Sequence, residues 1–181
     1  AGTGKTRAIT HRIAYAVAIG TMDPAKVLAL TFTAKAAGEM RTRLRSLSVP
    51  TVAARTIHSA ALKQLLYFWP SVFGGRTPDL VTTKTGFLTE AINRAGLNGS
   101  LRATNRELMR DIASEIEWAK VSQVAPPDFV DEISNRSQKP RVLPEQLVQI
   151  YTAYESIKKQ ELAIDFEDVL LLCAAMLEEE R

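Results

Sequence analysis

The sequence predicts an open α/β fold that carries a helical insertion, and three observations support this. The chain opens with a phosphate-binding pattern that runs directly into an amphipathic helix. Two short apolar stretches then alternate with helical patterns, as the strands of a parallel sheet do. From residue 83 to residue 163, apolar residues recur almost wholly at helical spacing.

The first six residues, AGTGKT, match the end of the P-loop pattern G-x-x-x-x-G-K-[ST], whose first glycine would precede Ala1. Glycines allow a tight turn that brings backbone N–H groups against phosphate oxygens. Lys5 can reach the β- and γ-phosphates of ATP, and the Thr6 hydroxyl can ligate Mg²⁺. We therefore expect catalytic roles for Lys5 and Thr6, with Thr6 as the metal ligand. The expected nucleotide-binding residues are Ala1, Gly2, Thr3, Gly4, Lys5, Thr6 and Arg7, although Arg7 could equally be a solvated helix residue.

The elements after this loop follow in a regular order. Gly20 comes just after the first helix, and Asp23-Pro24 starts a turn or helix. Residues 27–33 form a short apolar run typical of a buried parallel strand, and residues 52–55 form a second. Each strand leads into a helix, the first with an apolar face of Ala37, Met40, Leu44 and Leu47.

Beyond Trp69-Pro70 the strand signal is lost. Residues 71–82 are rich in turn residues, and helices follow over 87–95, after a capping box at 104–107, and after Pro126-Pro127 and Pro144. Asp165 is expected to cap the last helix with Asp168 as its partner, an interpretation that we prefer to a metal-binding pair.

Charge is distributed unevenly along the chain. Residues 1–50 have a net charge of +6 and residues 151–181 a net charge of −5, so the basic half is where a polyanion would bind. A solvated surface is the alternative explanation of this charge. A single cysteine, Cys173, excludes a disulfide framework, and no apolar run is long enough to span a bilayer. We expect a cytoplasmic protein without membrane contact.

Three motifs stand in an informative order: AGTGKT at 1–6, LTFTAKAAGEM at 30–40 and TIHS at 56–59. Together they resemble motifs I, Ia and Ib of UvrD/Rep/PcrA-type superfamily 1 DNA helicases. Residues 117–120 and 154–170 resemble further segments of that family, so the resemblance covers the chain. It implies a RecA-like P-loop domain whose first part is 1–69, a helical insertion subdomain over 70–163, and a return to the RecA-like domain at 164–181. The parallel sheet is expected to be incomplete, because the chain would be an N-terminal fragment cut at both ends.

The resemblance also implies an ATP-driven motor that moves 3′ to 5′ along single-stranded DNA and unwinds duplex, in DNA repair or recombination. Its partners would be single-stranded and partly duplex DNA and a second RecA-like domain. By the match to motifs Ia and Ib, the DNA-binding residues would be Thr31, Phe32, Thr33, Lys35, Thr56, His58 and Ser59. Phe32 ends a strand and could instead be a core residue.

A Walker B acid is not recognisable, because the only Asp-Glu pair, Asp131-Glu132, does not follow an apolar strand. The chain by itself is therefore expected not to hydrolyse ATP. Two alternatives remain open. A small P-loop kinase would leave the 30–40 and 56–59 motifs unexplained, and a non-catalytic P-loop module that binds DNA would lack turnover in any form.

Overall fold

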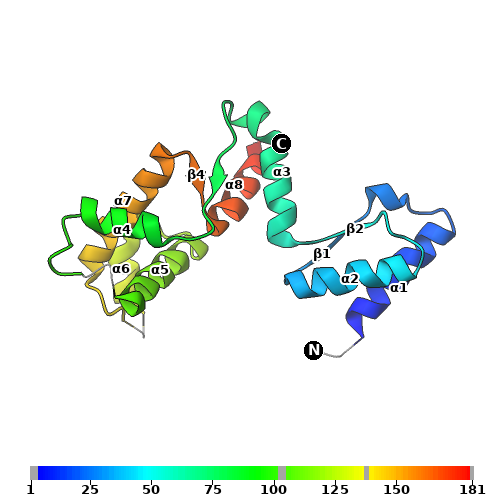
Figure 1. The fold of residues 1–181 in the computed structure, drawn as a ribbon, viewed down its shortest axis with the longest axis horizontal. Coiled ribbons are helices and arrows are strands. Elements are labelled where there is room, and N and C mark those ends of the chain that lie inside the picture. The colour runs from blue at the N-terminus through cyan, green and yellow to red at the C-terminus, as the bar shows by residue number, and fades with distance from the viewer. Residues whose placement is uncertain (1–3, 102–104, 137–138, 180–181) are drawn as a thin grey trace. The chain divides into compact units, whose positions relative to one another are not determined.

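The computed structural model describes residues 4–101, 105–136 and 139–179, and the chain divides into two compact units, Ala1–Gln64 and Leu65–Arg181 (Figure 1). The boundary between them falls inside helix α3 (Ile57–Val72), a few residues before the expected boundary at 69/70. Residues 164–179 pack within the second unit, so their expected membership of the RecA-like domain stays a prediction.

The first unit contains helix α1 (Lys5–Ala18), the 3₁₀ helix η1 (Pro24–Lys26), strand β1 (Leu28–Thr31), helix α2 (Ala34–Ser46), strand β2 (Ala53–Thr56) and the start of α3. This is the predicted order of elements. The strands pair in parallel, with Leu28 opposite Ala53 and Thr31 opposite Thr56. The α/β character predicted from the sequence is thereby confirmed for this part of the chain.

The core of the first unit lies on one face of the two strands. Ala29 and Ala54 are buried there with Met40 and Leu44 of α2, and Ile13 of α1 joins the same cluster. On the other face Leu28 and Leu30 remain 45% and 48% exposed. Strands of a parallel sheet are normally covered on both faces. The described helices of this unit therefore cover only half of what such a sheet requires.

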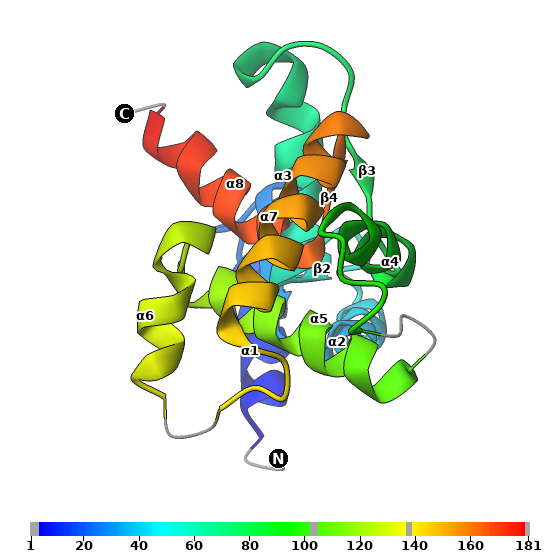
Figure 2. The ribbon, with the colours of Figure 1, turned by 90° about the vertical axis from the view of Figure 1, so that its left-hand side faces the viewer.

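Over its described residues, the second unit is helical apart from two short strands. Its helices are α4 (Thr85–Arg94), α5 (Arg106–Val121), η2 (Pro126–Asp128), α6 (Phe129–Ser134), α7 (Pro144–Gln160) and α8 (Phe166–Glu179). Strand β3 (Asp79–Leu80) pairs in parallel with β4 (Ala163–Ile164). Helix α7 is central: it contacts α4, α5 and α6 and buries Leu147, Ile150, Tyr154 and Ile157 among them (Figure 2). Within the described ranges, no helix is long and apolar enough to cross a membrane.

One local prediction needs correction. Asn105 caps α5 by accepting hydrogen bonds from the N–H groups of Glu107 and Leu108, at 3.0 and 3.2 Å. Thr104, the expected cap, lies outside the described residues. Helix α3 continues through Pro70 to Val72, because a proline so close to the end removes few helical hydrogen bonds. The rings of Trp69 and Phe73 pack 4.5 Å apart across this last turn.

Candidate nucleotide and DNA sites

The amino terminus of α1 is built to face an anion. Gly4 occupies the N-cap position without a side chain to bond the helix N–H groups, and its φ of 71° is a left-handed conformation that glycine adopts without strain. In the described part of the loop, neither a side-chain cap nor an acidic residue occupies the first turn of α1. Its N–H groups and the positive end of the helix dipole therefore remain available to a phosphate. Ala1, Gly2 and Thr3 lie outside the described residues.

The three residues that follow Gly4 form the first turn of α1. Lys5 and Arg7 are exposed and Thr6 is half-buried. The buried hydroxyl of Thr10 donates to the carbonyls of Thr6 and Arg7, each at 3.0 Å, which fixes the first turn. A cation and a hydroxyl beside uncapped amides fit the phosphates and Mg²⁺ of a bound nucleotide.

The two segments expected to bind DNA leave the sheet at the same edge. Because Thr31 lies opposite Thr56 in parallel strands, residues 31–35 and 56–59 emerge side by side. Thr33 caps α2 by accepting a hydrogen bond from Ala36 N–H at 3.1 Å. Thr56 accepts one from Ser59 N–H, also at 3.1 Å, at the start of α3. Two helix amino termini thus begin at this edge, where α/β sheets commonly bind ligands.

Side chains at this edge are open to solvent. Phe32 is 86% exposed, so the alternative that it belongs to the core is wrong. Lys35, His58 and Ser59 are also exposed, whereas Thr31 and Thr56 are half-buried. The structure therefore gathers the seven expected DNA-binding residues at one edge, and their contacts with DNA stay a prediction.

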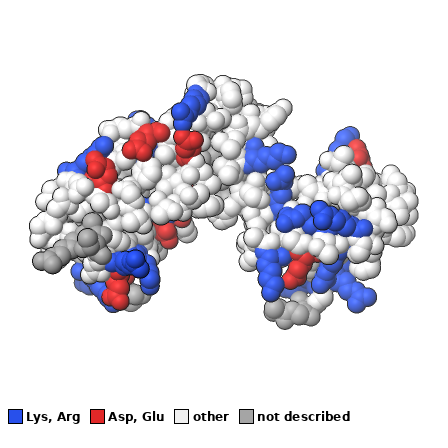
Figure 3. All heavy atoms as spheres, viewed as in Figure 1, with Lys and Arg blue, Asp and Glu red and all other residues white. Residues whose placement is uncertain are grey.

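Positive charge is concentrated in the first unit. Residues 1–64 contain ten Lys and Arg but only two Asp and Glu, a net charge of +8, whereas residues 65–181 have a net charge of −5. Figure 3 shows Lys and Arg side chains gathered over the part of the surface that carries α2. This polarity suits a polyanion on the first unit.

A buried ionic cluster in the second unit was not foreseen. Lys120 Nζ lies 2.8 Å from both carboxylate oxygens of Asp165 and 3.1 Å from Glu155. Lys158 Nζ lies 2.9 Å from Asp165 and 3.0 Å from Glu155. Both lysines also bind Asp168, and the Tyr154 hydroxyl donates to Asp165 at 3.1 Å. The cluster joins the 117–120 and 154–170 segments. The sequence showed that both segments resemble helicases, but it did not show that they contact each other.

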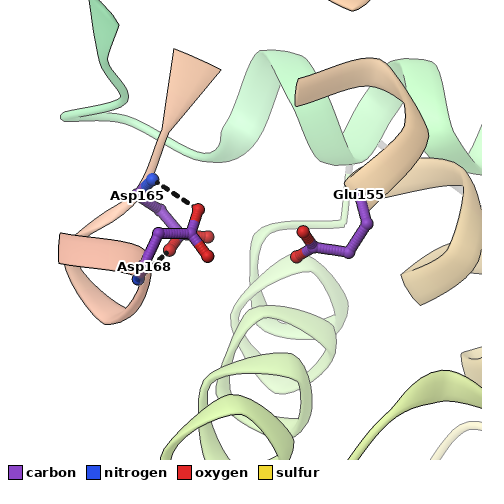
Figure 4. A group of neighbouring side chains, drawn as sticks. All are labelled: Glu155, Asp165 and Asp168. Atoms are coloured by element: carbon purple, nitrogen blue, oxygen red, sulfur yellow. Dashed lines mark hydrogen bonds between the residues drawn. The ribbon is translucent and has the colours of Figure 1, made fainter. Parts of the chain in front are cut away.

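The carboxylates of this cluster are engaged by lysines and by the backbone. Asp165 and Asp168 form the expected reciprocal cap, since each carboxylate accepts from the other residue's N–H at 3.0 Å (Figure 4). Together with Glu155 they bring ligand atoms within 4.8 Å of one another, as a metal site would. The ammonium groups of Lys120 and Lys158 already supply the positive charge there. The preference for capping over metal binding is therefore supported.

Burial and neighbouring charges shift the pKa values of the groups in this cluster. Burial alone would raise the pKa of Asp165, but the charges of Lys120 and Lys158 outweigh it and hold that pKa well below its usual value. Burial alone would lower the pKa of Lys120, but Asp165, Glu155 and Asp168 raise it above its usual value. Burial, with the nearby Glu155 carboxylate, raises the pKa of Tyr151 to about 12. Asp165 is therefore ionised, Lys120 charged and Tyr151 neutral at neutral pH.

A second lysine bridge lies near the start of α8. Lys84 Nζ contacts Glu117 at 2.7 Å and Glu167 at 2.8 Å, beside a cavity of about 490 Å³. Burial lowers the pKa of Lys84, but its two carboxylate partners raise it overall. The bridge connects the turn before α4 with α5 and α8.

A helix that begins at a P-loop-like sequence, beside a short parallel sheet with a basic surface, is typical of P-loop α/β proteins. The sequence matches the UvrD/REP helicase N-terminal domain over residues 1–181, and the chain belongs to this family. The resemblance inferred from the motifs is thus confirmed.

Three relatives are similar along nearly the whole chain. ATP-dependent DNA helicase UvrD2 of Mycobacterium tuberculosis is 41% identical over 189 residues, which cover 98% of this chain and 26% of the relative. ATP-dependent DNA helicase PcrA of Leuconostoc citreum is 32% identical over 178 residues, covering 95% and 22%. PcrA of Bacillus subtilis is 30% identical over 181 residues, covering 94% and 22%. The chain spans about a quarter of the length of these relatives.

Proposed function

We propose that the chain is the ATP-binding, N-terminal part of a DNA helicase that moves 3′ to 5′ along single-stranded DNA and unwinds duplex, in DNA repair or recombination. The names of the relatives, which are ATP-dependent DNA helicases, support the activity. One structural observation supports the site most directly. The register of Thr31 with Thr56 brings the segments that match motifs Ia and Ib to one edge of the sheet.

In this proposal the nucleotide lies at the amino terminus of α1. The loop that includes Ala1 to Thr6 would offer backbone N–H groups to the phosphates, Lys5 would pair with the β- and γ-phosphates, and Thr6 would hold Mg²⁺. The metal supplies neutralisation of charge on the phosphates when it is bound. The fit of this terminus to an anion rests on its uncapped first turn and on Gly4.

The DNA strand lies across the edge formed by residues 31–35 and 56–59. Hydroxyls and helix amino termini position backbone phosphates without reading sequence. An exposed aromatic ring such as Phe32 provides a stacking surface for any base. Helix α1 packs against the same two strands through Ile13, and this packing offers a path by which nucleotide binding changes the affinity for the DNA strand.

The remaining parts of the motor belong to the longer protein. A second RecA-like domain would supply the other wall of the nucleotide cleft and an arginine for the transition state. We also propose that residues 164–181 rejoin the RecA-like domain of 1–69 in that protein, leaving 70–163 as the insertion. A cytoplasmic location would place the enzyme with its DNA substrate.

The test uses the full-length protein with partial duplexes that carry either a 3′ or a 5′ single-stranded tail. We expect ATP-dependent strand separation only with the 3′ tail, and phosphate release that single-stranded DNA stimulates. Equal unwinding from a 5′ tail would contradict the polarity. Transfer of phosphate to an acceptor other than water would identify a kinase, and DNA binding without any ATP turnover would identify a non-catalytic module.

A further inference from the structure

A cavity lined by arginines lies beside strand β2 in the first unit. Its volume is about 320 Å³, and its wall consists of residues 50–55 with Arg41 and Arg45 of α2 and Ser59 of α3. Three of these residues, Arg41, Arg45 and Arg55, are cationic, and none of the described lining residues is acidic. The cavity therefore concentrates positive charge in a hollow large enough for a phosphate group and its neighbouring sugar.

Local structure places the arginines together. Arg41 and Arg45 are one helical turn apart on α2, so they share a face of that helix. Arg41 Nη1 donates to the carbonyl of Ala54 at 2.9 Å, which fixes its guanidinium against β2. Arg43 lies between them in sequence, but it does not line the cavity. The same helix thus carries both the cavity residues and a matched arginine outside it.

We propose that this cavity binds a backbone phosphate of the DNA strand that crosses the 56–59 segment, which makes the inference dependent on the proposed function. Ser59 connects the cavity with the 56–59 segment, because it belongs to that segment and also lines the cavity. Guanidinium groups donate two parallel hydrogen bonds to phosphate and are more weakly hydrated than ammonium groups. Arg45 and Arg55 provide these donors, while Arg41 is partly engaged by the strand.

The alternative ligand is an acidic peptide, whose carboxylates also suit guanidinium groups. DNA is favoured by the continuity with Ser59 and by the net charge of +8 over the whole unit. A phosphate of ATP is a second possible source, and the experiment separates it from the phosphate of DNA.

The experiment compares Arg45→Gln, Arg55→Gln and the control Arg43→Gln in the full-length protein. Affinity for an oligothymidine strand is measured across a salt series, and the KM for ATP is measured in parallel. Each phosphate contact that is lost should reduce the slope of log affinity against log salt by about 0.7. We expect this reduction for Arg45→Gln and Arg55→Gln, no such reduction for Arg43→Gln, and an unchanged KM for ATP.

Other results would overturn the inference in distinguishable ways. An equal reduction in all three variants would indicate diffuse surface charge. A raised KM for ATP with an unchanged DNA slope would assign the cavity to the nucleotide. An unchanged slope for the cavity variants, while Phe32→Ala weakens DNA binding, would remove the cavity and leave the proposed function standing. If Phe32→Ala also has no effect, the proposed DNA edge fails together with the cavity.

Discussion

Lys120 Nζ lies 2.8 Å from each carboxylate oxygen of Asp165, although 45 residues separate them in the sequence. Both side chains are almost wholly buried. Two buried charges of opposite sign stabilise a fold only as a pair, because each one alone would bear the full cost of leaving water. The pair therefore ties α5 to the turn between β4 and α8 and makes the second unit sensitive to loss of either partner.

Replacement of Lys120 by methionine should destabilise the protein strongly. The substitution keeps most of the volume but leaves part of the Asp165 charge uncompensated, at a cost of about 3–5 kcal/mol in the free energy of unfolding. Urea unfolding followed by tryptophan fluorescence measures this, since Trp118 lies in the same unit. Lys159→Met, on the exposed side of α7, is the control and should change stability by less than about 0.5 kcal/mol. If Lys120→Met lowers the free energy of unfolding no more than Lys159→Met does, the pair contributes little to stability.

Stability should fall at both extremes of pH. The folded-state pKa of Asp165 lies below its ordinary 3.8, so its contribution is fully present above that pH and is lost as pH falls further. The folded-state pKa of Lys120 lies above its ordinary 10.5, so its contribution is fully present below 10.5 and is lost as pH rises further. We expect a plateau in this contribution between about pH 5 and pH 10.

The acid limb can be assigned to Asp165 by substitution. Below pH 3.8 the unfolded chain binds a proton that the folded protein does not, which costs up to about 1.4 kcal/mol per pH unit. The Asp165→Asn variant cannot bind this proton, so its free energy of unfolding should depend less steeply on pH in that range. Identical acid slopes in the two proteins would assign the loss to other carboxylates.

Phe32→Ala should weaken binding of single-stranded DNA by the full-length protein. Loss of a stacked base costs about 1–3 kcal/mol, and a ring that is 86% exposed contributes little to folding. Fluorescence anisotropy across a salt series measures the affinity. Tyr15→Ala removes another exposed aromatic ring of the first unit, on α1, and should leave affinity unchanged. If Phe32→Ala behaves like this control, Phe32 does not contact DNA.

Lys5→Ala should abolish ATP-driven unwinding by the full-length protein, because Lys5 is the cation placed at the uncapped terminus of α1. The 181-residue chain by itself is expected not to turn over ATP. Among the described strands, β4 is followed directly by a carboxylate, Asp165, but that group is bound by Lys120 and Lys158 rather than open to a metal. Phosphate release from the chain alone, stimulated by DNA and absent in Lys5→Ala, would contradict this expectation.

Local patterns in the sequence predicted the helices well. The helix predicted after Pro144 is α7, and its apolar residues Leu147, Ile150, Tyr154 and Ile157 are all buried. Strand β1 was also found, although it is shorter than the predicted 27–33 and ends at Thr31. Strands β3 and β4 were missed, because a two-residue strand has no periodicity to detect. Their pairing depends on contacts between segments far apart in the chain.

The candidate sites also differ in whether a local sequence pattern could reveal them. Motif matches identified the residues at the β1–β2 edge, since each motif is a short continuous segment. The Lys120–Asp165 pair and the arginine cavity combine residues from different elements, so no local pattern reveals them. Lys120 stood on the apolar face of α5 next to Ala119, and a lysine at such a position is a signal for a buried partner. Its partner could not be chosen from sequence alone.

In the part of the chain that the structure describes, Arg41 also covers a backbone group at the edge of the two-stranded sheet. Ala53 N–H bonds to Val27 on the β1 side, and successive backbone groups of a strand point to opposite edges, so the carbonyl of Ala54 faces away from β1. An unpaired strand edge can recruit a second chain and begin aggregation. Arg41 donates a hydrogen bond to this carbonyl, and Arg45 and Arg55 add positive charge nearby. Another copy of the chain would bring the same charges, and their repulsion opposes growth of the sheet between molecules.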